Sequence, residues 1–225
     1  MPDADIVGVM DVPPLLDHIV IAGPSLEELV DWFRDLTGVT AAPGGRHPVG
    51  TANALIALTV DGEKRPHYLE LVGPDPEREG EELPKMFHIH RLKKPTLLTY
   101  AAHPENIDQV VERARENGVE LGEVQSLSRT TPDGQELQWR LTQAKPPINY
   151  GLPFLIDWGS TDQPGLGDLP SLELVSFTRV EVKPEPLRKA TAALGLDDRL
   201  AEIREGHGSR FVLVVRTEDR REIEV

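Results

Sequence analysis

The sequence contains no cysteine among its 225 residues. Disulfide bonds, thiolate metal sites and cysteine nucleophiles are therefore excluded. No stretch approaches the ~18 consecutive apolar residues of a membrane-spanning helix. Residues 1–5 also lack the basic and apolar regions of a signal peptide. We therefore expect a soluble, cytoplasmic protein with no membrane partner.

Basic residues are also scarce. Lys and Arg number 24 against 38 Asp and Glu, so the formal net charge is -14 and the sequence pI is about 4.9. Nucleic acid and anionic membranes are poor partners for such a chain, because no basic cluster replaces their counterions. The sequence has no Walker loop, dinucleotide fingerprint or Gly-x-Ser-x-Gly motif, so we expect no nucleotide cofactor.

The first part of the chain is typical of one strand, one helix and about three further strands. Residues 15–22 are apolar and β-branched, which predicts a strand. Ser25 and Glu28 have capping-box spacing, and Gly38 ends the helical pattern that follows them. A Gly-rich loop over 43–48 then leads to strands predicted over 54–60 and 66–72.

This order of elements starts again twice. Pro24, Pro104 and Pro184 each open a predicted helix and lie 80 residues apart, and the first two helices end at Gly38 and Gly118. The pattern predicts an α+β fold of repeated βαβββ modules. The expected divisions are an N-terminal arm (1–14), a first module (15–73), a linker (74–95), a second module (96–159), a linker (160–171) and a third, shorter module (172–225).

Three passages resemble the glyoxalase-like branch of the vicinal-oxygen-chelate superfamily, which includes glyoxalase I, extradiol dioxygenases and bleomycin-resistance proteins. They are residues 16–21 (Leu-Asp-His-Ile-Val-Ile), residues 45–54 with 68–73, and residues 129–134 with 152–159. The resemblance implies that two paired modules curl their mixed sheets into a cup, with the helices outside. It also implies that the cup holds a divalent metal and a small oxygenated organic molecule.

Two activities are open under this resemblance. One is a divalent-metal-dependent lyase, isomerase or dioxygenase; the other is metal-free binding or sequestration of a small molecule, as in resistance proteins. Because the superfamily hosts many reactions, its fold does not choose between them.

His18 and Glu70 occupy the metal-ligand positions that the resemblance implies. Strand alternation places Leu69 and Leu71 on one face and Glu70 on the other, so Glu70 is expected to point into the cup. An imidazole and a carboxylate suit Zn, Fe, Mn or Ni. The pair could instead act as polar catalytic groups, and His18 alone could be a satisfied histidine in a half-buried strand.

The second module does not repeat these ligands, and the third repeats only the carboxylate. The counterparts of His18 are Leu98 and Thr178, and the counterparts of Glu70 are Ile156 in the second module and Glu224 in the third. The first two modules thus supply two clear ligands, whereas sites in this superfamily use three or more. This departure favours the metal-free alternative and leaves the third ligand unassigned.

Five further residues are candidates for substrate binding. His47 lies in a Gly/Pro loop and either contacts substrate or packs on its neighbouring proline. Asn53 either caps its strand or bonds ligand, and Arg129 could clamp an anionic substrate. Trp139 could stack on an organic ring or belong to the core, and Asp157 could face either pocket or packing.

The odd number of modules suggests one further hypothesis. A third module without a partner in its own chain would expose an apolar sheet face. Such a face could be covered by a second copy of the chain, which would make a homodimer.

Overall fold

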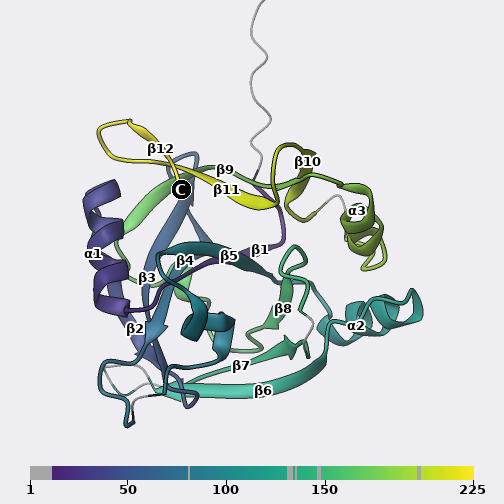
Figure 1. Ribbon diagram of the computed structural model, residues 1–225, viewed down its shortest axis with the longest axis horizontal. Coiled ribbons are helices and arrows are strands. Elements are labelled where there is room, and N and C mark those ends of the chain that lie inside the picture. Colours follow the sequence, from purple (N-terminus) through teal and green to yellow (C-terminus); the bar gives the residue numbers. More distant parts are fainter. Residues whose placement is uncertain (1–11, 81, 131–133, 135, 146–147, 197–198) are drawn as a thin grey trace, which may run out of the picture.

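A single curved sheet forms a cup, with helices on its outside, in the computed structural model of the chain (Figure 1). The structure describes residues 12–80, 82–130, 134, 136–145, 148–196 and 199–225. Its elements are β1 (Leu16–Ala22), α1 (Leu26–Thr37), β2 (Ala42–Arg46), β3 (Thr51–Val60), β4 (Glu63–Pro74), η1 (Met86–Arg91), β5 (Thr96–Ala102), α2 (Ile107–Glu116), β6 (Glu123–Thr130), β7 (Glu136–Gln143), β8 (Phe154–Asp157), η2 (Pro164–Leu166), β9 (Ser171–Glu181), α3 (Glu185–Ala192), β10 (Glu202–Glu205), β11 (Arg210–Arg216) and β12 (Glu222–Glu224). This architecture confirms the predicted α+β class with repeated βαβββ modules.

The first helix begins and ends where the sequence predicts. The Ser25 hydroxyl accepts a hydrogen bond from the backbone N–H of Glu28, and Gly38 ends the helix with a φ of 79°. Leu29 and Phe33 are fully buried and pack against the outer face of the sheet. Burying this apolar stripe stabilises the helix on the sheet.

Strand β1 lies at the centre of the sheet and joins the first two modules. It pairs in parallel with β4 and antiparallel with β5, so that His18 is level with Tyr68 on one side and with Ala101 on the other. Strand β8 pairs with β5, and β7 and β6 follow in order. These three strands continue the sheet beyond β5, and β6 lies close to β2 (Figure 1).

The third module extends the sheet instead of standing apart. Strand β9 pairs in parallel with β3, and β11 and β12 continue beyond it. The rings of Phe177 and Phe211 stack with centroids 5.2 Å apart, and the Tyr100 ring contacts both edge-on. All three side chains belong to the same core as Phe33 on α1.

The expectation that the third module exposes an apolar sheet face is therefore wrong for the described residues. Among the described residues, the exposed large apolar side chains come from separate parts of the chain, and only one of them belongs to the third module: Val49, Leu166 and Val182. The physical reason is that the outer face of β1 and β5 needs a cover, and the third module supplies it within the chain. This removes the reason given for a homodimer.

Two connections also differ from expectation in detail. The Gly-rich loop over 43–48 contains a strand, β2, which pairs antiparallel with β3. Gly44 allows this close pairing, because a Cβ there would lie 2.2 Å from the Asn53 side chain. The expected linker over 74–95 contains a short 3-10 helix, η1. No helix in the described part of the chain has the length and apolar character needed to cross a membrane.

Candidate functional site

The cup contains a cavity of about 770 Å³, a size typical of small-molecule sites. Its walls are largely apolar and aromatic, and its rim includes residues of η1 and the segment before it. Buried polar side chains occur together at its floor, where β3, β4, β1 and β5 run side by side. The polar floor residues are His18, Asn53, Glu70 and Thr99.

Strand alternation explains why these side chains face the cavity. Ile19 of β1 and Leu69 and Leu71 of β4 point to the outer core and are completely buried. The alternate residues, His18 and Glu70, then point into the cup and line the cavity. The orientation predicted for Glu70 agrees with this placement.

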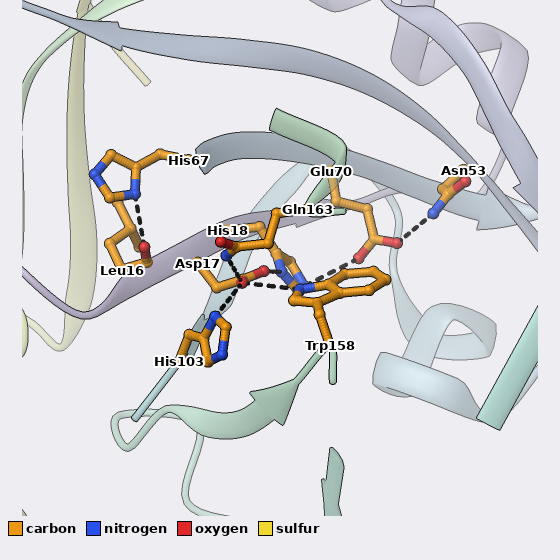
Figure 2. Close-up of polar contacts among 9 residues, drawn as sticks. All are labelled: Leu16, Asp17, His18, Asn53, His67, Glu70, His103, Trp158 and Gln163. Atoms are coloured by element: carbon orange, nitrogen blue, oxygen red, sulfur yellow. Dashed lines mark hydrogen bonds and ion pairs between the residues drawn. The ribbon is translucent and has the colours of Figure 1, made fainter. Parts of the chain in front are cut away.

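A continuous series of polar contacts crosses the floor (Figure 2). His18 Nε2 lies 3.8 Å from Glu70 Oε2, and Asn53 Nδ2 donates a hydrogen bond of 2.5 Å to Glu70 Oε1. Asn53 Oδ1 accepts from the backbone N–H of Gly45, which fixes the orientation of the amide. His47 lies next in the series, 3.4 Å from the Asn53 amide nitrogen.

Asp17 holds His18 from behind. Its side chain is completely buried and accepts hydrogen bonds from His18 Nδ1 at 2.7 Å, Trp158 Nε1 at 3.0 Å and Gln163 Nε2 at 2.7 Å (Figure 2). His103 Nδ1 lies 3.7 Å from the same carboxylate. Because Asp17 accepts from Nδ1, the proton of a neutral His18 ring is on Nδ1 and Nε2 is directed at Glu70.

The His18 ring is also held by packing. It stacks on Tyr68 with ring centroids 4.6 Å apart and contacts Phe154 edge-on at 5.3 Å. Two further aromatic groups of the cavity wall, Trp139 and Trp158, lie 5.6 Å apart. Tyr150 lines the cavity too, and partial burial raises the pKa of its phenol, which keeps the hydroxyl protonated.

A comparison with known families identifies the chain that builds this floor. The sequence profile described as "Glyoxalase-like domain" matches residues 16–195. The chain belongs to this glyoxalase-like family. The resemblance identified from residues 16–21, 45–54 with 68–73, and 129–134 with 152–159 is thereby confirmed.

Comparison with solved structures finds the fold of this glyoxalase-like chain in a protein of low sequence identity. A hypothetical protein from Staphylococcus aureus aligns with a TM-score of 0.62 and 16% identity over 87% of each chain. Methylmalonyl-CoA epimerase from Streptomyces coelicolor, in complex with 2-nitronate-propionyl-CoA, aligns with a TM-score of 0.42 and 21% identity over 68% of this chain and 100% of its own. Methylmalonyl-CoA epimerase from Mycobacterium tuberculosis aligns with a TM-score of 0.39 and 18% identity, over 67% of this chain and 91% of its own. The comparison with curated proteins gives no match.

The glyoxalase-like site brings together only part of the predicted substrate-binding set. His47, Asn53 and Trp139 line the cavity, and Trp139 is also half-buried against Trp158. Asp157 points to the other face of β8, where its carboxylate lies 3.5 Å from the Arg140 guanidinium. Arg129 belongs to β6, but its side chain lies outside the described residues.

Asp17 was not among the site residues predicted from the sequence. The signal was a carboxylate inside an otherwise apolar strand, which is costly to bury without hydrogen-bond donors. Gln163 left no such signal, because it lies in a polar connection that reads as a linker. Their role depends on chain segments more than 140 positions apart in the sequence.

The donor set at the floor does not fit a resident metal held by three or more side chains. His18 Nε2 and Glu70 Oε2 converge, and Asp17 supports the histidine as outer carboxylates support metal ligands. Within the described ranges, however, no group of three His, Asp or Glu side chains could hold one ion. The second oxygen of Glu70 is already bonded to Asn53. We therefore derive no reaction step through a metal.

Proposed function

We propose that this glyoxalase-like domain binds a small oxygenated organic molecule in the cup, with a ligand oxygen between His18 and Glu70. The observation that supports this is the placement of the buried polar series at the floor of an otherwise apolar cavity of about 770 Å³. Polar groups that converge in an apolar pocket fix the orientation of a ligand, while the walls supply the contact area.

The distance between the two polar atoms suits a single ligand oxygen. His18 Nε2 and Glu70 Oε2 are 3.8 Å apart, too far for a direct hydrogen bond. One oxygen can lie at about 2.8 Å from both atoms, which is ordinary hydrogen-bond length. With one proton on the pair, a ligand hydroxyl can accept a hydrogen bond from one side chain and donate to the other.

A second candidate function is proton transfer in an isomerase or lyase reaction. The observation that favours it is the arrangement of two titratable groups at the floor, one of which is oriented by a buried carboxylate. General acid–base catalysis uses such groups when they are within reach of a ligand proton. Binding without turnover is the sequestration alternative, and the two are separated by whether bound ligand is recovered unchanged.

The test is a ligand-observed NMR screen of small phenols, enols, ketones and diols, followed by calorimetry on the hits. We expect hits to bind the natural sequence and to lose at least tenfold in affinity in His18→Gln. His207→Gln, at an exposed position outside the cavity, is the matched control and should bind normally. Hits that bind His18→Gln as well as the natural protein would contradict the proposal.

The metal implied by the family is tested in the same assay. We expect hit affinities to change less than threefold when Zn²⁺, Mn²⁺ or Ni²⁺ is added, or after dialysis against EDTA. The physical reason is that two side-chain donors hold such ions weakly. Stoichiometric metal that is lost in Glu70→Gln, together with metal-dependent binding, would contradict this expectation.

A further inference from the structure

We infer that the cavity selects uncharged oxygenated molecules and rejects organic anions such as carboxylates and phosphate esters. This inference rests on the proposed binding function and concerns the charge of the ligand. It contrasts with the alternative, left open by the sequence, that Arg129 could clamp an anionic substrate.

Two carboxylates control the charge of the cavity floor. Glu70 is 7% exposed and faces the ligand position, and Asp17 is completely buried directly behind His18. When the histidines are neutral, Glu70 and Asp17 give the floor a net charge of two negative units. A proton on His18 would reduce this net charge to one negative unit. Asp17 is stabilised by N–H donors of Trp158 and Gln163, which satisfy its oxygens without cancelling its charge.

No permanent positive charge balances the floor among the described residues. Among the described residues that line the cavity, Lys85 is the only lysine or arginine. It lies in the rim segment, its side chain is 80% exposed, and its ammonium is 3.4 Å from the Glu82 carboxylate. A lysine so placed is screened by water and by its partner, so it offers little to an anion at the floor.

The walls strengthen the repulsion between the floor and an anionic ligand. Leu55, Tyr68, Ile156 and Trp158 belong to one buried, largely apolar cluster and line the end of the cavity beside Glu70. Like charges repel more strongly where water is excluded, and a desolvated anion needs a positive partner that is missing there. An uncharged hydroxyl or carbonyl compound does not meet this penalty.

The probes for this inference are 2-naphthol and 2-naphthoate, which share a ring system and differ in the charge of the polar group at neutral pH. Calorimetry should give a dissociation constant at least tenfold lower for 2-naphthol. In Glu70→Gln the ratio between the two constants should fall at least threefold. Glu224→Gln makes the same charge change at an exposed position outside the cavity and should leave the ratio unchanged.

Each other outcome overturns the inference in a distinct way. Equal or tighter binding of 2-naphthoate contradicts it while the binding function stands, and loss of that binding in Arg129→Gln would assign the anion to Arg129. A preference for 2-naphthol that Glu70→Gln leaves intact shows that the floor charge is not its cause. If neither probe binds and the wider screen gives no hit either, the proposed function itself fails.

Discussion

Replacing Asp17 by asparagine removes one buried charge and keeps the shape of the side chain. Asp17 accepts from three N–H donors, on His18, Trp158 and Gln163. The amide oxygen of asparagine can still accept from Trp158 and Gln163, and its NH₂ can donate to His18 Nδ1 once the ring proton moves to Nε2. All three hydrogen bonds then lose their charged partner, at about 0.5–1 kcal/mol each. The free energy of unfolding should therefore fall by about 1.5–3 kcal/mol.

Urea unfolding measures this loss directly. Asp168→Asn makes the same chemical change at an exposed position and should cost less than about 0.5 kcal/mol. In the unchanged protein, long-range ¹H–¹⁵N spectra should show neutral His18 protonated on Nδ1. A loss below about 1 kcal/mol in Asp17→Asn, or a neutral His18 ring protonated on Nε2, would refute the role assigned to Asp17.

Three further predictions concern stability. Burial lowers the pKa of His67, although its hydrogen bond to the Leu16 carbonyl opposes this shift. As the pH falls, the unfolded state therefore binds a proton before the folded state does. The free energy of unfolding should fall as the pH drops below about 6.5. His67→Asn keeps a donor and removes the titration, so its urea-derived stability should fall less over pH 7 to 5, and equal slopes would contradict this. Gly73→Ala puts a Cβ 2.6 Å from the Leu26 backbone nitrogen, so unfolding should become about 1–3 kcal/mol easier, and an unchanged urea midpoint would contradict the packing. Phe177→Ala should cost about 3–5 kcal/mol in one cooperative transition, whereas separate unfolding of the third module would show that it does not share the core.

Local patterns were enough to predict the elements that build the floor of the cup. The capping pair Ser25 and Glu28, the stop at Gly38 and the alternation through residues 68–72 each depend on neighbours in the sequence. The same alternation predicts that Glu70 faces the cavity with His18.

Contacts between distant segments could not be predicted in the same way. Asp17 depends on Trp158 and Gln163, whose positions follow from the paired modules and the connection after β8. The docking of Phe177 on Tyr100 depends on the parallel pairing of β9 with β3, which hydrophobic periodicity does not specify. The face that Asp157 takes was also left open by the sequence. In the structure its neighbour Ile156 lines the cavity, so Asp157 points to the opposite face of β8.

The most direct test of the ligand site uses the three tryptophans of the chain. Trp139 and Trp158 line the cavity, whereas Trp32 belongs to α1 and does not line it. Titration of ¹⁵N-tryptophan-labelled protein with a ligand that binds should shift the Trp139 and Trp158 indole signals saturably and leave the Trp32 signal in place. A bound ligand that shifts only Trp32, or none of the three, would contradict the assignment of the cup as the binding site.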